Sequence, residues 1–450
     1  MQKLLISLFF VFASSIYAEE LEVHLSTQIS LPQLYISPIT TDPSEFDWRY
    51  FEDLRAVLQF DLSTCGLCSL LPPNLEWNHA LQSAPLSKQF NLSFWKMQKV
   101  PFVLTLEVFE NHLYITAFQV EKETFKKYPG YRLSGQMGTD RKNIHRLADA
   151  IQKDLFGLEG ISSLQLIYTQ RIQNPNGNDP EWLSEIWLSD VDGANARQIT
   201  NEQNYCLSPA FLPTKQNGAD FYFISYKGGQ SKIYKASFNN PKPEPMVVLR
   251  GSQLLPSLSK KGTQMAFIAD TAGRPDLFIQ YFDTAGRMIG KARQLFSAPR
   301  ATQASPTFSP DGRQIAFVSD KDGPPRIYVL EITSPKETKK IHPRVLTKKN
   351  RENTSPSWSP DGKRLAYSAK TEGIRQIWLY DFETDEETQL TMGPDNKENP
   401  AWAPNSFHLV YNTENETSCE IYQINLEQKT PILISKGMGQ KRFPSWEPRF

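Results

Sequence analysis

An eight-residue motif, Ser-Pro-x-(Phe/Trp)-Ser-Pro-Asp-Gly, occurs at 305–312 and again at 355–362, and weaker copies lie on either side. The copies are marked by six prolines: Pro209, Pro256, Pro306, Pro356, Pro400 and Pro444. Successive prolines are 47, 50, 50, 44 and 44 residues apart, a period typical of propeller blades and longer than that of TPR or ankyrin repeats. Because one such unit cannot bury its apolar face alone, neighbouring units must pack together.

Each repeat unit has the pattern of four β-strands. Pro310, Asp311 and Gly312 suit the second, third and fourth positions of a tight turn. That turn joins the Ser-Pro strand to an alternating strand at 314–320, which is followed by strands at 326–329 and 344–347. The next unit repeats the pattern at 364–368, 376–379 and 388–391. The repeat is therefore all β.

The order of the strands predicts a closed ring. The first unit, at 166–169, 185–190 and 197–200, has no Ser-Pro strand before it, and the last Ser-Pro strand, at 444–448, has nothing after it. If the C-terminal strand completes the first blade, the two half-units make one. We therefore expect residues 161–450 to form a six-bladed β-propeller closed by the C-terminal strand, in preference to an open β array or separate β domains.

Residues 19–160 have a different pattern and predict a separate α/β (α+β) domain. Apolar residues at helical spacing run from Ile144 to Leu155 and stop at Gly157, and a second stripe includes Phe51, Leu54 and Leu58. Strands are expected at 103–108 and 113–118, joined by a turn at 110–112. A length of 450 residues also favours two domains over one.

The first 18 residues have the features of a secretory signal peptide. Lys3 precedes an apolar stretch that ends in Ser15-Ile16-Tyr17-Ala18. The stretch is roughly 15 residues long, shorter than the ~20 needed to span a bilayer. The mature chain is therefore expected to be exported and not inserted in a membrane. Lys plus Arg and Asp plus Glu both number 49, which argues against nucleic acid as a partner.

Known catalytic and metal-binding motifs are missing from the sequence. It contains no G-x-S-x-G, H-E-x-x-H, Walker A or helix-opening G-x-G-x-x-G pattern. Its six histidines form no close pair, so no metal site, no cofactor and no catalytic residue is predicted. Cys65 and Cys68 have C-x-x-C spacing but follow an amphipathic stretch instead of opening a helix, which favours a local disulfide or free thiols over redox catalysis.

Polar residues just before each Ser-Pro strand are the candidate binding residues. They lie where one blade leads into the innermost strand of the next, so they are expected to surround one mouth of the central channel, and rigidly held polar loops often bind partners. This predicted rim consists of Gln253, Gln303, Glu352, Asn353, Glu398, Asn399 and Arg442. Phe308, Trp358, Trp402 and Trp446 recur at one repeat position and are expected to pack between blades.

Together, the signal peptide, the small N-terminal domain, Ser-Asp-Val-Asp-Gly at 189–193, the repeats and Phe-Pro-Ser-Trp-Glu-Pro at 443–448 resemble the TolB family of the Tol-Pal system. The resemblance implies a periplasmic, monomeric, non-enzymatic scaffold. It would bind the lipoprotein Pal at one propeller face and the protein TolA through its mature N-terminal segment, here Glu20, Leu21, Glu22, Val23 and His24. Such proteins keep the outer membrane attached and draw it inward during cell division.

The chain departs from the family pattern in its last copies. Ala-Pro-Asn-Ser at 403–406 replaces Ser-Pro-Asp-Gly, and Glu447 stands in place of Ser. The alternative function is a periplasmic propeller enzyme, peptidase-associated or a glycan lyase, working at the channel mouth. That alternative requires a cluster of His, Arg and metal-binding residues on one face, which the sequence pattern does not indicate.

Overall fold

The computed structural model describes residues 31–41, 46–82, 90–175, 177, 180–213, 220–239, 242–333, 342–415 and 417–449. The predicted signal peptide and the segment from Glu20 to His24 lie outside these ranges. Residues from Pro32 onward belong to one compact unit. None of the helices within the described ranges combines the length and the apolarity of a bilayer-spanning segment.

A mixed β-sheet forms the centre of the N-terminal domain. Its order is β2-β1-β3-β4-β5, with β6 also paired to β4. The strands are β1 (Gln33–Thr41), β2 (Ser69–Leu70), β3 (Phe102–Phe109), β4 (His112–Gln119), β5 (Thr124–Lys127) and β6 (Tyr131–Arg132). β1 runs parallel to β2 and β3, whereas β4 is antiparallel to β3, β5 and β6. The predicted α/β class is therefore confirmed.

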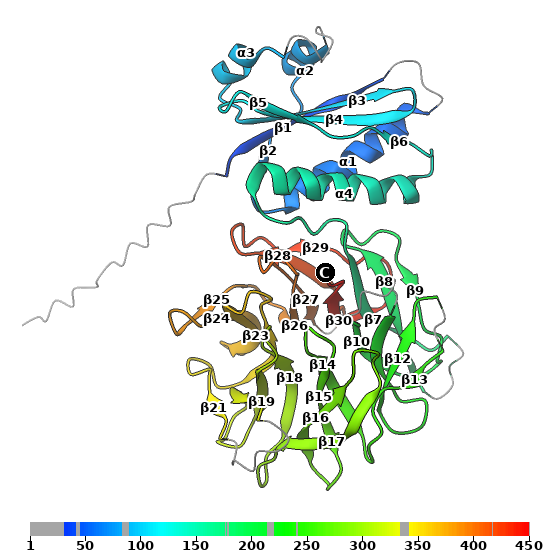
Figure 1. Ribbon diagram of the computed structural model, residues 1–450, viewed down its shortest axis with the longest axis vertical. Coiled ribbons are helices and arrows are strands. Elements are labelled where there is room, and N and C mark those ends of the chain that lie inside the picture. Colours follow the sequence, from blue (N-terminus) through cyan, green and yellow to red (C-terminus); the bar gives the residue numbers. More distant parts are fainter. Residues whose placement is uncertain are drawn as a thin grey trace, which may run out of the picture. The chain divides into compact units, whose positions relative to one another are not determined.

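Helices cover both faces of this sheet (Figure 1). They are α1 (Trp48–Thr64), α2 (Leu75–Gln82), α3 (Leu92–Met97) and α4 (Met137–Phe156). α1 and α4 bury Leu54, Leu58 and Ile151 in one core, and α3 packs Trp95 in a second core around Tyr35. α4 ends as expected at Gly157, whose φ of 77° is the left-handed conformation that glycine adopts without strain.

The second domain consists of six four-stranded antiparallel sheets. Blade 1 contains β7 (Gln165–Gln173), β8 (Trp182–Asp190), β9 (Arg197–Gln198) and β30 (Gln440–Trp446). Blade 2 contains β10 (Cys206–Phe211), β11 (Asp220–Ser225), β12 (Lys232–Ser237) and β13 (Glu244–Pro245). Blade 3 contains β14 (Gln253–Leu258), β15 (Gln264–Asp270), β16 (Pro275–Phe282) and β17 (Met288–Phe296).

Blades 4 to 6 follow the same plan. Blade 4 contains β18 (Gln303–Phe308), β19 (Gln314–Ser319), β20 (Arg326–Glu331) and β21 (Arg344–Val345). Blade 5 contains β22 (Asn353–Trp358), β23 (Arg364–Thr371), β24 (Ile374–Asp381) and β25 (Glu386–Gln389). Blade 6 contains β26 (Asn396–Trp402), β27 (His408–Glu414), β28 (Ile421–Asn425) and β29 (Ile432–Leu433). β21 is two residues shorter than predicted, and short strands protect a sheet edge from unwanted pairing.

The C-terminal strand closes the ring as predicted. β30 pairs antiparallel with β7, with Ser445 opposite Ile167 and Trp446 opposite Leu166. Figure 1 shows red β30 beside green β7, so the two ends of the propeller sequence share one blade. The indole of Trp446 is buried, and its Nε1 donates to the Ala401 carbonyl of blade 6 at 3.0 Å. Closure therefore completes blade 1 by strand pairing and joins it to blade 6 through Trp446.

Several polar contacts join the N-terminal domain to the propeller, among them the ion pair between Arg141 on α4 and Asp192 after β8. The guanidinium of Arg449 lies 2.5 Å from the Asp149 carboxylate on α4. Asn405 Nδ2 donates to the Glu159 carbonyl at 3.0 Å. His408 Nε2 lies 3.3 Å from the Thr64 carbonyl at the end of α1. Each contact uses a residue near the start or the end of a propeller strand.

Deleting the last eight residues, Phe443–450, should destabilise the whole propeller. The deletion removes half of β30 and the buried Trp446, and loss of a buried aromatic side chain alone costs about 3–5 kcal/mol. We expect a Tm at least 10 °C below that of the full chain, measured by circular dichroism. Deleting only 448–450 leaves the β30 pairing intact and should cost less; equal melting of the eight-residue deletion and the full chain would contradict ring closure by β30.

His408 should make the folded state sensitive to mild acid. Burial lowers the pKa of His408 to about 4, well below its ordinary value of 6.5. Between pH 6.5 and 4 the unfolded chain therefore takes up a proton that the folded chain refuses, so the free energy of unfolding falls as the pH falls, by about 1.4 kcal/mol per pH unit.

Urea denaturation at pH 7, 5.5 and 4.5 tests this dependence. The slope should be shallower for His408→Gln than for the wild type, whereas His112→Gln, a substitution of the partly exposed histidine at the start of β4, should keep the wild-type slope. Identical slopes for all three proteins would rule out the assigned role of His408.

Candidate functional site

A bulge in every innermost strand shapes the central channel. In each blade the residue before the repeat proline has a positive φ, between 44° and 53°, and the strand register shifts at that point. Proline suits a bulge because it has no N–H to contribute to the ladder. As a result all six repeat prolines, Pro209, Pro256, Pro306, Pro356, Pro400 and Pro444, line one cavity of about 160 Å³.

The residue three positions before each repeat proline is buried. Gln253, Gln303 and Asn353 from the predicted rim occupy this position in blades 3, 4 and 5. Gln253 Oε1 accepts a hydrogen bond from Ile233 N at 3.2 Å, and Asn353 Nδ2 donates to Thr347 Oγ1 at 2.9 Å. These three side chains hold neighbouring strands together, and a partner at the mouth would not reach them.

The other four rim residues are at least partly accessible and cluster on blades 5, 6 and 1. Glu352 precedes β22, Glu398 and Asn399 lie in β26, and Arg442 lies in β30. Ser355 Oγ donates to Asn399 Oδ1 at 3.1 Å, which connects blade 5 to blade 6. The structure therefore brings four of the seven predicted residues together at one sector of the mouth.

Alternating charges link these blades in a group that we call the mouth network: Glu352, Lys370, Arg375, Glu398, Glu414 and Arg442. Arg375 on β24 lies 3.3 Å from Glu398 of the next blade and 3.7 Å from Glu352. Arg442 of blade 1 lies 2.8 Å from Glu414 of blade 6. The network contains three acidic and three basic side chains, so it offers partners of either charge without a strong net field.

The pKa of the Glu398 carboxyl group is shifted by its surroundings in the mouth network. Burial raises its pKa above the ordinary range, and the nearby Glu414 carboxylate raises it further, while Arg375 and Arg442 oppose both effects. A partner that offers a hydrogen-bond donor or a positive charge here would relieve this repulsion. The geometry is suited to recognition of polar groups on another protein.

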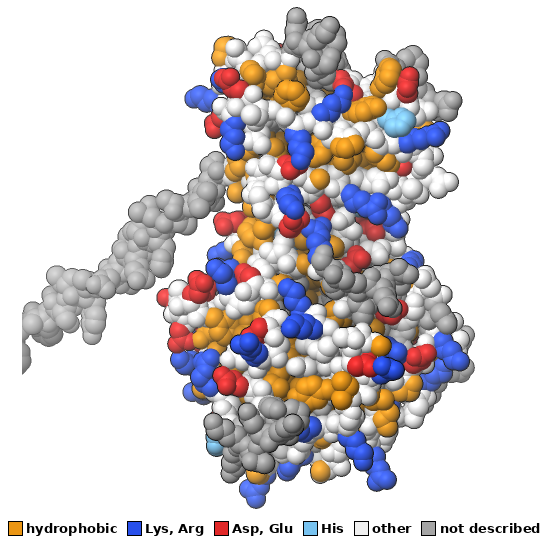
Figure 2. Space-filling view, in the orientation of Figure 1, with side chains coloured by type: hydrophobic (Ala, Val, Ile, Leu, Met, Phe, Trp, Pro, Cys, Tyr) orange, Lys and Arg blue, Asp and Glu red, His pale blue; other side chains and the backbone are white. Residues whose placement is uncertain are grey.

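Three members of the mouth network were not predicted from the sequence. Lys370, Arg375 and Glu414 come from β23, β24 and β27, which are not the innermost strands. They lie at the ends of hairpins opposite the Asp-Gly turns, so pairing each predicted rim residue with the facing end of its own hairpin would have found them. Figure 2 shows basic and acidic side chains interspersed over the visible face, in keeping with a balanced surface.

A second cavity lies at the Asp-Gly end of the channel. It has a volume of about 600 Å³, and its lining includes Phe308, Trp358, Trp402 and Trp446. Trp402 Nε1 donates to the Ser357 carbonyl of the neighbouring blade at 3.1 Å. This member of the four recurring aromatic residues therefore packs between blades, as expected. The two ends of the channel therefore differ, with charges at the mouth network and aromatic side chains at the other end.

The Cys65-Cys68 pair is buried at the end of α1 as free thiols whose Sγ atoms lie 3.9 Å apart. The hydrogen bond from Cys68 lowers the pKa of the Cys65 thiol, and the same bond, together with burial, raises that of Cys68. Neither side chain is accessible to a protein substrate. The arrangement suits a structural pair better than a redox site.

Comparison with known proteins places this architecture among characterised sequences. A family model described as "TolB beta propeller domain" matches residues 154–450. A protein named "Protein TolB homolog" from Protochlamydia amoebophila (strain UWE25) is 43% identical over 294 residues, which cover 65% of this chain and 62% of that protein. A protein of the same name from Chlamydia pneumoniae is 35% identical over 292 residues, covering 64% and 61%.

The matched region thus spans about three fifths of the length of these relatives. Among solved structures, TolB from Acinetobacter baumannii superposes with a TM-score of 0.74 and 22% identity. The superposition covers 93% of this chain and 97% of that one, so the fold extends over both domains.

Proposed function

The chain belongs to the TolB β-propeller family, and from that membership we propose that it is a non-enzymatic periplasmic scaffold of the Tol-Pal system. It binds the lipoprotein Pal through the mouth network and TolA through the mature N-terminal segment that starts near Glu20. By joining these partners it helps keep the outer membrane attached and draws it inward during division. The observation that carries the proposal is the family match over the whole propeller.

The mouth network supports the assignment of Pal to this face. Its charged groups come from three adjacent blades, and each blade fixes them through strand pairing, so a partner meets a preorganised surface. When a partner binds, ion pairs within the network can be replaced by ion pairs to the partner. The desolvation cost of this replacement is small, because these side chains are partly exposed before binding. A folded protein domain with charged loops fits such a surface better than a small apolar ligand does.

A pair of matched variants tests the Pal site. Glu352→Ala with Lys370→Ala removes a 3.3 Å ion pair of blade 5 whose side chains are 40% and 45% exposed. We expect the affinity for purified Pal, measured by isothermal titration calorimetry with the mature protein, to fall at least tenfold because two mouth charges are lost. The wild type should bind Pal with one-to-one stoichiometry.

The control removes an equivalent pair at the other end of the same blade. Lys363 and Glu383 are also 3.3 Å apart and are 56% and 68% exposed, and both double variants leave the net charge unchanged. Lys363→Ala with Glu383→Ala should bind Pal like the wild type. Weaker binding by the control alone would move the Pal site to the Asp-Gly end, and no binding of Pal by any of the proteins would refute the proposed function.

The N-terminal segment provides a separate test for TolA. A mature chain that begins after His24 lacks the proposed TolA-binding residues but keeps the whole propeller. In pull-downs it should lose TolA and retain Pal, whereas the Glu352/Lys370 variant should show the reverse. Retention of TolA by the shortened chain would contradict this part of the proposal.

A further inference from the structure

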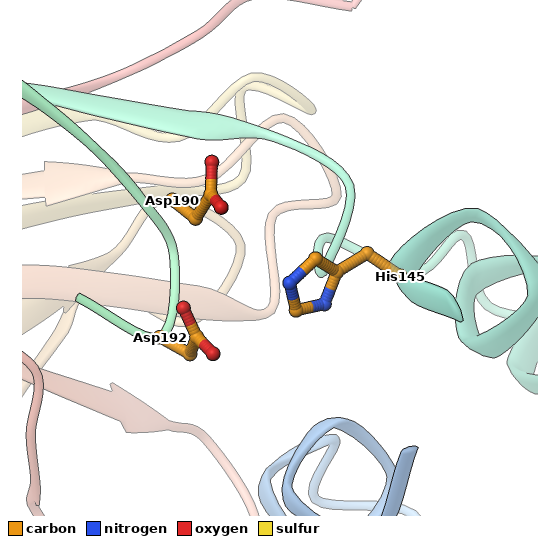
Figure 3. Close-up of side chains that lie close together, drawn as sticks. All are labelled: His145, Asp190 and Asp192. Atoms are coloured by element: carbon orange, nitrogen blue, oxygen red, sulfur yellow. The ribbon is translucent and has the colours of Figure 1, made fainter. Parts of the chain in front are cut away.

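A histidine and two aspartates from distant parts of the chain meet beside α4. His145 lies on α4, Asp190 is the last residue of β8, and Asp192 follows in the next turn. Their potential ligand atoms all lie within 4.8 Å of one another, and all three residues are buried. Figure 3 shows the imidazole ring of His145 facing the two carboxylates. Within the described residues this is the one group of His, Cys, Asp and Glu side chains so arranged.

One ring nitrogen of His145 has no partner. Nδ1 lies 2.7 Å from Asp61 Oδ2 on α1, and the side chain is only 2% exposed. Nε2 is buried and makes no hydrogen bond to any described residue. In Figure 3 this nitrogen, the one farther from the backbone attachment, points toward the carboxylates. A buried polar atom left unpaired costs about 1–3 kcal/mol, so its presence at this point calls for a ligand.

The surrounding hydrogen bonds fix the orientation of all three side chains. Asp61 holds the imidazole, in the manner of the carboxylates that support metal-binding histidines. Asn195 Nδ2 donates to Asp190 at 2.6 Å, and Ala194 N and Arg141 both donate to Asp192. A carboxylate has about four lone-pair positions, so each aspartate keeps the capacity to bind one more group.

The charges of the group favour a divalent cation. Three carboxylates, those of Asp61, Asp190 and Asp192, lie close to His145, and the guanidinium of Arg141 pairs with only one of them. Uncompensated charge is expensive where it is buried. A divalent ion would offset this excess of carboxylates and give the unpaired Nε2 a partner.

We propose that His145 Nε2, Asp190 and Asp192 bind a divalent transition-metal ion, for which Zn²⁺ is the best match. Zn²⁺ accepts both imidazole nitrogen and carboxylate oxygen at about 2.0–2.2 Å, whereas Mg²⁺ and Ca²⁺ prefer oxygen alone. Ligand atoms around tetrahedral Zn²⁺ lie about 3.3 Å apart, so the three groups close by no more than about 1.5 Å, within reach of side-chain rotation.

The bound ion would join the two domains. Its ligands come from α4 of the N-terminal domain and from blade 1 of the propeller. Because such a site exists only in the folded chain, metal binding raises the Tm. The sequence pattern did not predict this site, because Asp190 and Asp192 are 45 and 47 residues away from His145.

Zn²⁺ titration of the chelator-treated mature protein, without an affinity tag, tests the site. Calorimetry and metal analysis should find one bound Zn²⁺ in the wild type. In His145→Gln and in Asp190→Asn the affinity for Zn²⁺ should be at least ~100-fold weaker. Asp61→Asn leaves the ligands in place and should weaken binding by a smaller factor of about 10–100. The Tm of the wild type should rise with Zn²⁺ and that of the two ligand variants should not.

Matched controls separate this site from other metal-binding groups. His112→Gln and Asp283→Asn replace one histidine and one aspartate elsewhere and should bind Zn²⁺ like the wild type. Cys65→Ser with Cys68→Ser should also retain this Zn²⁺, because the thiols are not its ligands. Equal binding by the ligand variants and the wild type, loss of Zn²⁺ only with the cysteines, or a preference for Mg²⁺ over Zn²⁺ would each overturn the proposal. If His145→Gln fails to fold, Asp190→Asn and Asp192→Asn decide the outcome in the same assays.

Discussion

The pairing of β30 with β7 is the constraint on which the propeller depends. It pairs Trp446 with Leu166 and so brings the two ends of the propeller sequence into one blade. Every blade packs its apolar face on the next, so a ring with this pairing has no exposed blade and a ring without it has two. Such a long-range contact is slow to form, because closing a long loop costs chain entropy before the contact offsets it.

The repeat proline then decides which side chains reach a partner. The bulge before each proline fixes the register of the innermost strand, so the residue three positions before the proline is buried in the blade. In blade 4 that residue is Gln303, and in blade 1 it is Lys441, which is fully buried and lies 3.1 Å from Glu420. Buried polar groups at this position tie adjacent strands together, and recognition is left to the residues around them. A binding surface on this fold is therefore confined to a few positions per blade.

Periodic features of the sequence predicted most of the fold. The proline period and the half-units at the two ends were sufficient for six blades and for their closure, and helical spacing was sufficient for α1 and α4. β1, α2 and α3 were not predicted, because their segments have no repeated pattern and are stabilised by packing around Tyr35 and Trp95. The mouth was predicted only in part, since Arg375 and Glu414 lie on β24 and β27, outside the innermost strands that carry the repeat motif.

Ring closure and docking of the N-terminal domain involve the same few residues. Asp149 on α4 accepts hydrogen bonds from Ser162 N at 2.7 Å and Ser163 N at 3.2 Å, which fixes the linker. The same carboxylate pairs with Arg449, three residues beyond the end of β30. Gly160 is required here, because a Cβ would lie 2.6 Å from the backbone of Asp149. Because Arg449 follows β30 by three residues, its ion pair with Asp149 couples the docking of the N-terminal domain to the seating of β30 in blade 1.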